Sequence, residues 1–327
     1  MRKRAVLLLA AVLLAMLLPG CGRQEKSESK PPLLILDTDL ASDADDVGAV
    51  AVLHHLADQG RVRILAMMVS SANPWSAACL QSLNAWFGRP EIPVGKAAAG
   101  AVEDESAYTH AIAEEFPCPA AEPQEAVTLY RRLLAEQADQ SVLLVTTGYL
   151  TNLDRLLRSK PDALSPLTGL ELVRRKVRHL VCMGGQYPSG QEWNFHQDAA
   201  AAAYVVSHWP RPIFFVGFEL GKDILTGAGL RRLPAKNPIR RSYELHNKLA
   251  GRPSWDQIAV YYAVMASNDG QSAFWSTISG RNLVQADGSN RWLAETEQNA
   301  AHAYLVQRAE SGQIASQLEQ LMLTAAP

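Results

Sequence analysis

Five strongly apolar segments recur along the chain, and segments with helical patterning separate them. The apolar segments span residues 33–36, 62–70, 141–148, 177–185 and 211–221. Each is continuously apolar rather than alternating, which is typical of parallel strands that helices cover on both faces. The segments that favour helices span residues 47–60, 76–88, 126–137, 150–159 and 198–209. This alternation predicts an α/β fold with a single open, mostly parallel central sheet wound with helices.

Polar residues follow four of these apolar segments. An acidic loop comes directly after the first segment, Asn73 follows the second, Thr146 to Gly148 end the third, and residues 184–194 follow the fourth. In open α/β sheets, ligands bind outside the carboxyl ends of the strands. The sequence therefore predicts that these polar residues converge on one binding site at that edge of the sheet.

The acidic loop, DTDLASDADD (37–46), holds five carboxylates: Asp37, Asp39, Asp43, Asp45 and Asp46. Carboxylates this close together repel one another unless a cation or strong hydrogen-bond donors compensate. Hard divalent cations prefer carboxylate and carbonyl oxygens, so the loop predicts a metal site. Capping of the helix that follows would account for Asp45 and Asp46, but not for all five acids.

Two other kinds of acidic loop fit the sequence less well. In a haloacid dehalogenase-type phosphatase, a strand-end DxD supplies an aspartyl nucleophile, and Gly or Val and then Thr or Val follow soon after the second acid. Here Leu40-Ala41-Ser42 follows. An EF-hand loop has Gly at its sixth position and Glu at its twelfth, where this chain has Ser42 and Gly48. The phosphatase stays open as an alternative, and the EF-hand is the weaker of the two.

Together with four later motifs, the acidic loop resembles the inosine-uridine preferring nucleoside hydrolase family, whose members open with a strand and a DxDxxxDD-type loop. The loop is two residues longer here, so that Asp43 is an extra acid and the residues that match the pattern are Asp37, Asp39, Asp45 and Asp46. The later matches are Asn73 in VSSANPW, Thr147 in TTGYLTN, Glu192 and Asn194 in the segment 183–198, and Asp256 in SWD. The resemblance implies a nucleoside hydrolase-like sheet with a Rossmann-like core.

The resemblance also implies a reaction, namely calcium-dependent hydrolysis of the N-glycosidic bond of ribonucleosides to ribose and a free base. The groups that would hold Ca²⁺ are Asp39, Asp46, the Thr147 carbonyl and Asp256. Asp39 would also be the catalytic general base toward the attacking water. The residues that would bind the sugar hydroxyls are Asp45, Asn73, Glu192 and Asn194, and Asp37 would orient the loop. The implied partner is a small-molecule nucleoside or a related riboside.

Two features depart from the family pattern, and both concern the base. The histidine-rich loop of the family is replaced by residues 103–117, which contain one histidine, His110. Trp255 stands where some members have a histidine before the last aspartate, and we expect it to bind the base by stacking. His54 and His55 lie in a predicted helix away from the strand ends and are expected to be packing or surface residues. A surface protein that binds ribosyl compounds without cleaving them stays open as a second alternative.

The N-terminal residues predict export to the cell envelope. Residues 1–20 combine a basic start with an apolar run that is too short for comfortable membrane spanning. LPGC (18–21) resembles the lipobox of bacterial lipoproteins, which predicts lipidation at Cys21 rather than an ordinary cleaved signal peptide. Residues 21–30 are polar and predict a flexible tether, so residues 31–327 would form one nucleoside hydrolase-like domain. We expect a bacterial envelope protein anchored to the membrane by its lipid, facing the periplasm or the cell exterior.

Charge and cysteine content argue against several other classes. Without residues 1–20 the chain keeps 28 of its 31 basic residues against 33 acidic ones, a net charge of about −5. No basic tract follows the signal, so nucleic acid is not an expected partner. Cys79, Cys118 and Cys182 show no CxxC spacing, which argues against a zinc site and a disulfide framework, although one pair could form. The sequence leaves the oligomeric state open, and a homo-oligomer is compatible with it.

Overall fold

The computed structural model describes residues 30–269, 273–294 and 301–324. The predicted signal sequence (1–20) and Cys21 lie outside these residues, as does nearly all of the predicted tether. Within the described part, no helix combines the length and the apolar composition that crossing a bilayer requires.

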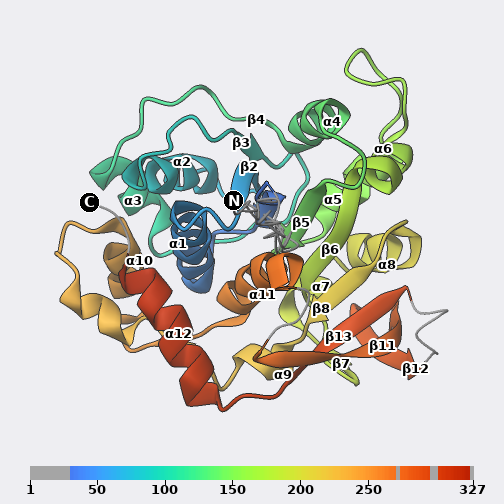
Figure 1. Cartoon of the computed structure of the whole chain (residues 1–327). Coiled ribbons are helices and arrows are strands. Elements are labelled where there is room, and N and C mark those ends of the chain that lie inside the picture. Colours follow the sequence, from blue (N-terminus) through green and yellow to red (C-terminus); the bar gives the residue numbers. More distant parts are fainter. Residues whose placement is uncertain (1–29, 270–272, 295–300, 325–327) are drawn as a thin grey trace, which may run out of the picture. The chain divides into compact units, whose positions relative to one another are not determined.

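One eleven-stranded sheet runs through the described residues (Figure 1). Its strands, in spatial order, are β4 (Gln124–Glu125), β3 (Val94–Lys96), β2 (Arg63–Val69), β1 (Leu33–Thr38), β5 (Val142–Thr146), β6 (Val177–Met183), β8 (Ile213–Val216), β13 (His302–Gln307), β11 (Trp275–Val284), β12 (Ser289–Ala294) and β7 (Ser189–Gln191). Neighbours from β4 to β13 pair in parallel, and the last three strands add an antiparallel edge. The predicted open, mostly parallel sheet is confirmed, and the five apolar segments form five adjacent strands at its centre, β2, β1, β5, β6 and β8.

Helices connect most of the strands, and every predicted helical segment overlaps one of them. The helices are α1 (Asp45–Asp58), α2 (Ser76–Trp86), α3 (Thr109–Glu115), α4 (Ala126–Glu136), α5 (Thr151–Arg158), α6 (Gly169–Lys176), α7 (Trp193–Gln197), α8 (Ala199–His208), α9 (Phe218–Gly221), the 3₁₀-helix η1 (Ala228–Arg232), α10 (Pro238–Asn247), α11 (Trp255–Asp269) and α12 (Ser311–Leu323). A separate two-stranded sheet pairs β9 (Leu225–Thr226) with β10 (Arg252–Pro253).

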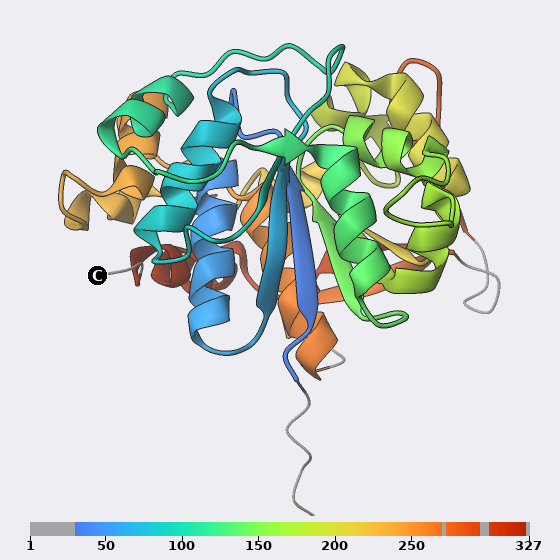
Figure 2. The same ribbon diagram turned by 90° about the horizontal axis from the view of Figure 1, so that it is seen from above.

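The two faces of the central sheet carry separate apolar cores, each covered by helices (Figure 2). Along β1, Leu34 and Leu36 join the core beneath α1 and α11, whereas Ile35 joins the core beneath α4, α5 and α8. Because successive strand residues point to opposite faces, a strand that is covered on both sides must be apolar at every position. This is why the central strands read as unbroken apolar runs.

Helices α1 and α11 pack against each other although they are far apart in the sequence. Gly48 makes their close approach feasible, because a Cβ at this position would overlap the side-chain amide of Gln257. Acidic residues occupy the first turns of both helices: Asp45 and Asp46 on α1, and Asp256 on α11. The helix pair thereby brings carboxylates that are far apart in the sequence to the carboxyl edge of the strands.

Candidate active site

A cavity of about 390 Å³ lies at the carboxyl ends of the central strands. Every predicted metal-binding, sugar-binding and base-binding residue except Asn73 lines this cavity. A volume of this order is typical of sites for small ligands. The predicted binding residues other than Asn73 therefore meet at one site, at the edge of the sheet where they were expected.

Asp39 leaves the end of β1 and enters the cavity wall as a buried residue. Its backbone carbonyl accepts a hydrogen bond from the Ser71 hydroxyl at 2.6 Å. Gly148 lies so close to this segment that a Cβ there would overlap the Asp39 backbone nitrogen. The next residue, Leu40, has a φ of 40° and is fully buried, a strained backbone conformation of the kind that clusters at functional sites. Neighbouring strands thus fix where the Asp39 carboxylate lies.

Three buried carboxylates form the group best placed to hold a metal ion. Asp45, Asp46 and Asp256 each offer an oxygen within 4.8 Å of the others. The Asp256 backbone N–H donates to Asp45 Oδ2 at 3.4 Å, and the Thr38 hydroxyl donates to Asp46 Oδ1. Asp39 lies close enough to Asp46 for their negative charges to repel each other. The group includes Asp45, to which the family resemblance gives a sugar-binding role, and Asp39 lies beside it rather than within it.

The electrostatics of these carboxylates fit a bound cation. Burial raises the pKa of Asp45, Asp46 and Asp256 well above the usual value, and repulsion from neighbouring carboxylates raises it further. Burial is also the main reason why the pKa of Asp39 is raised to about 7. A divalent ion among these oxygens would reverse the shifts because it favours the charged form of each group. Oxygen donors of this kind suit Ca²⁺ or Mg²⁺.

Asp37 lies behind this group and not in the cavity wall. Its carboxylate accepts hydrogen bonds from the Tyr130 hydroxyl at 2.9 Å and from Asn152 Nδ2 at 3.1 Å. Burial outweighs these two bonds and raises the pKa of Asp37 to about 7. Asn152 also donates to the Val69 carbonyl at 3.0 Å, so Asp37 ties β1 to β2, α4 and α5. This is the geometry expected of a residue that orients the loop.

Glu192 and Asn194 enter the cavity from the segment that starts α7. Glu192 caps the helix, accepting from the Asn194 N–H at 2.7 Å and the Phe195 N–H at 3.2 Å, and it also accepts from the Gly185 N–H at 3.0 Å. Burial nevertheless raises the pKa of Glu192 to about 7. Asn194 Nδ2 donates to the Thr147 carbonyl at 3.1 Å. Both side chains are therefore held rigidly, and the Thr147 carbonyl, a predicted metal ligand, is oriented by one of them.

Three aromatic side chains form an apolar wall of the cavity: Trp193, Phe218 and Trp255. The rings of Phe218 and Trp255 stack with their centroids 5.4 Å apart, and Trp255 Nε1 donates to the Phe218 carbonyl at 2.7 Å. Trp193 is 56% exposed and Phe218 is 37% exposed, which is unusual for such large apolar residues. Trp255 was expected at this place, and the other two were not.

Asn73 does not line the cavity, because its amide binds the segment 103–117. Its Nδ2 donates to the Asp104 carbonyl at 3.0 Å, and its Oδ1 accepts from the Thr109 hydroxyl at 3.2 Å. Asp104 in turn accepts from the Ser42 hydroxyl at 2.9 Å and the Tyr149 hydroxyl at 2.7 Å. The segment that replaces the family's histidine-rich loop is thus bonded to the acidic loop. The sugar-binding role of Asn73 stays a prediction.

Sequence reasoning also missed several residues that line the cavity. They are Ser42, Met183, Trp193, Phe218 and Arg252, and Asp43 was noted only as an extra acid. Among the described residues, Arg252 is the one cationic side chain in the lining. Position in the loop could have indicated Ser42, and position between Glu192 and Asn194 could have indicated Trp193. No local signal marks Phe218 or Arg252, because only the tertiary fold brings them to the cavity.

Comparison with known proteins decides the family. A family model described as inosine-uridine preferring nucleoside hydrolase matches residues 34–314. The chain belongs to this family. The predicted enzyme class is therefore confirmed, and this nucleoside hydrolase is an N-glycosidic bond hydrolase. Membership also favours hydrolysis of an N-glycosidic bond over the hydrolysis of a phosphate ester that the phosphatase alternative requires.

Solved structures share the fold of this nucleoside hydrolase. A purine-preferring ribonucleoside hydrolase from Gardnerella vaginalis has a TM-score of 0.69 and 18% identity, covering 90% of this chain and 100% of the other. An inosine-uridine preferring nucleoside hydrolase from Bacillus anthracis has a TM-score of 0.68 and 15% identity, covering 90% and 100%. The type III effector protein XopQ, complexed with adenosine diphosphate ribose, has a TM-score of 0.63 and 15% identity, covering 91% and 95%. A search of curated proteins returns no match.

Proposed function

We propose that this nucleoside hydrolase requires Ca²⁺ and cleaves ribonucleosides to ribose and a free base. The observation that carries the proposal is the meeting of the Asp45, Asp46 and Asp256 carboxylates with Glu192 and Asn194 around one cavity. Carboxylates that can hold a metal ion, rigid polar side chains and an aromatic wall are together what binding of a sugar ring and a base requires.

The proposed metal ligands are Asp39, Asp46, the Thr147 carbonyl and Asp256, and Asp45 lies close enough to join them. A bound divalent cation would neutralise the carboxylates, orient the ribose hydroxyls and polarise the attacking water. The buried Thr147 hydroxyl has no partner among the described residues, as is expected where a ligand group is missing from a polar site.

Asp39 is the proposed general base. It takes the proton of the water that attacks C1′, while the bond from C1′ to the base nitrogen breaks and its electron pair leaves with the base. Asp45, Glu192 and Asn194 hold the sugar hydroxyls. Glu192 and Asn194 suit this task because backbone N–H groups and the Thr147 carbonyl fix their side chains before substrate binds. Trp255 stacks on the base.

A substrate panel tests this function on the soluble form that begins near Pro31. Release of ribose from purine and pyrimidine nucleosides, in Ca²⁺ but not in excess chelator, is the expected result. Adenosine diphosphate ribose belongs in the panel because the similar fold of XopQ was determined with that compound. Binding of nucleosides without release of ribose would instead support the ribosyl-binding alternative. Release of phosphate from a nucleoside monophosphate, tested in parallel, would support the phosphatase.

We also propose that the full-length protein is anchored in the bacterial cell envelope by lipid at Cys21. Its support is the LPGC motif after a basic and apolar N-terminus. Full-length protein should partition into detergent, and the Cys21→Ala variant should not. Equal partitioning of the two would show that lipid at Cys21 is not the anchor.

A further inference from the structure

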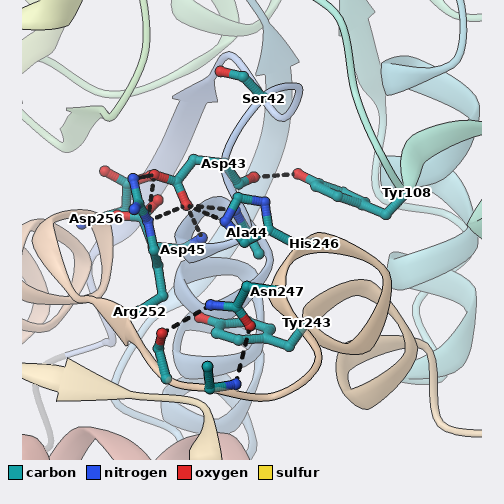
Figure 3. A network of polar contacts seen from close by, with 12 residues as sticks. Ser42, Asp43, Ala44, Asp45, Tyr108, Tyr243, His246, Asn247, Arg252 and Asp256 are labelled. Atoms are coloured by element: carbon teal, nitrogen blue, oxygen red, sulfur yellow. Dashed lines mark hydrogen bonds and ion pairs between the residues drawn. The ribbon is translucent and has the colours of Figure 1, made fainter.

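Asp43, the extra acid of the loop, makes more polar contacts than its place outside the family pattern suggests (Figure 3). Its two carboxylate oxygens lie 2.8 and 2.7 Å from Arg252 Nε, and Arg252 Nη2 also donates to Oδ2. Oδ1 in addition accepts from the Ala44 N–H at 2.6 Å, directly before α1. A bidentate ion pair of a guanidinium and a carboxylate is among the strongest and most directional polar contacts in proteins.

The position of this ion pair in the chain indicates what it does. Asp43 lies two residues before Asp45, at the start of α1, and Arg252 lies four residues before Asp256, at the start of α11. Asp43 and Arg252 are 209 residues apart in the sequence, and the segment around each carries part of the carboxylate group that would hold the metal. The ion pair therefore joins the segment of Asp45 and Asp46 to the segment of Asp256, next to the carboxylates themselves.

Other side chains restrain the pair from several directions. The Tyr108 hydroxyl donates to the Asp43 carbonyl at 2.6 Å, and His246 Nε2 lies 3.7 Å from Asp43 Oδ1. The Arg252 guanidinium lies 5.4 Å from the centre of the Trp255 ring. The Asp43 side chain is 23% exposed and that of Arg252 is 34% exposed, so solvent screens the pair less than a surface ion pair. A contact held in this way fixes a distance and does not merely add attraction.

We propose that Asp43 and Arg252 form a clamp that holds Asp45 and Asp46 at the right distance from Asp256 for the cation. Buried carboxylates without a metal repel one another, so the segments that carry them tend to separate. The clamp opposes this separation and keeps the metal site assembled. Both residues are positioning residues that act through the ligands, and the inference rests on the cation site of the proposed function.

Calcium affinity measured by calorimetry separates a clamp from a simple charge effect. Loss of the Arg252 cation alone would favour Ca²⁺ binding, and loss of the Asp43 anion alone would disfavour it. A clamp predicts that Asp43→Asn and Arg252→Gln both weaken Ca²⁺ binding, by roughly 10- to 100-fold, the usual effect of removing the groups that orient metal ligands. The double variant should bind Ca²⁺ at least as tightly as the single variant with the lower affinity, because either change alone already opens the clamp.

Two further variants control for charge and for stability. Arg252→Lys keeps the cation but cannot form the two-pronged contact, so it should also weaken Ca²⁺ binding. Arg241 and Glu115 form a similar pair between α10 and α3, with Arg241 Nε and Nη2 3.0 to 3.2 Å from the Glu115 oxygens. Neither residue lines the cavity. Arg241→Gln should therefore leave the Ca²⁺ affinity unchanged while removing a comparable contact.

The outcomes distinguish the clamp from the proposed function. Unchanged or tighter Ca²⁺ binding by folded Arg252→Gln and Arg252→Lys, with a wild-type protein that binds Ca²⁺ and releases ribose, would overturn the clamp alone. Absence of Ca²⁺ binding by the wild-type protein would overturn the metal-dependent function, and the clamp with it. Equal losses in Arg241→Gln and Arg252→Gln would show general destabilisation and would likewise overturn the clamp.

Discussion

The position of the Asp39 carboxylate suits the general-base role proposed for it. The side chain borders the cavity, and the fixed backbone at Ser71 and Gly148 gives it little freedom to move away. A general base must lie within hydrogen-bond reach of the proton that it accepts, and its pKa must suit the working pH. The motif alone could predict that Asp39 lines the site, because all of its sequence context is local to one loop.

Asp39→Asn should lower kcat by roughly 10²- to 10⁴-fold, the usual contribution of general-base catalysis. The amide can still offer one oxygen to a metal, but it cannot accept the proton of water. Steady-state kinetics on the best nucleoside of the panel measures the effect, and calorimetry with Ca²⁺ checks that the metal site survives. Retention of most of the wild-type kcat would remove Asp39 from the role of general base.

Trp255 lies in the cavity wall with Phe218 stacked against it. Its indole N–H donates to the Phe218 carbonyl and is no acid at neutral pH, so stacking is what the ring offers a departing base. Trp255→Ala should lower kcat/KM for ordinary nucleosides much more than for a nitrophenyl riboside, whose leaving group departs without help. Stacking on one base is worth about 1 to 3 kcal/mol, which sets the size of the expected difference. Equal losses for both substrates, with Ca²⁺ binding intact, would assign Trp255 a structural role.

At the scale of elements, the sequence predicts the centre of the sheet better than its edge. The central strands β1, β5 and β6 are covered on both faces, so their composition differs sharply from that of a helix or loop. Strand β11 mixes buried, half-buried and exposed residues, because it belongs to the antiparallel edge, and β7 has three residues. Such strands lack the unbroken apolar signal, and this is why the antiparallel edge was not predicted.

Helix α1 carries a buried histidine whose protonation should cost stability. His54, expected to be a packing or surface residue, is fully buried, and its ring stacks on Phe87 with centroids 4.3 Å apart. Its Nε2 lies 2.9 Å from Asn84 Oδ1, and its Nδ1 lies 3.2 Å from Arg89 Nη1, which donates to it. This arrangement requires the neutral ring. Burial lowers the pKa of His54 to about 4, against 6.5 for the ordinary side chain.

The sign of the pH dependence follows from this lowered pKa. Between about pH 6.5 and pH 4 the unfolded chain binds a proton at His54 that the folded chain does not, so stability falls as the pH falls through this window. The full loss amounts to about 3 kcal/mol, because one pKa unit corresponds to about 1.4 kcal/mol. Urea unfolding at pH 7 and pH 5 should show a smaller loss for His54→Gln than for the wild type. The neighbouring variant His55→Gln should behave like the wild type, and equal losses in all three would contradict the assignment.

At the scale of the whole molecule, the site depends on contacts that no local pattern specifies. Asp43 and Arg252 are 209 residues apart, and they meet only because α1 and α11 pack together. The family resemblance could bring Asp256 to the same site as the acidic loop, since both are motif positions. Arg252 belongs to no motif, so its contact with Asp43 could be found only in the folded structure.

Metal binding should therefore stabilise the whole domain and not just one loop. Asp45 and Asp46 on α1 lie far in the sequence from Asp256 on α11, so a cation that links them opposes separation of the two helices. A ligand at about 100 times its Kd stabilises the folded state by about 2.7 kcal/mol. Excess chelator should lower the melting temperature by several degrees, and added Ca²⁺ should restore it. The Asp256→Asn variant is the matched control, because it should melt at nearly the same temperature with and without Ca²⁺. A wild-type melting curve that does not move in chelator, with metal removal verified by elemental analysis, would show that these carboxylates do not hold a structural cation.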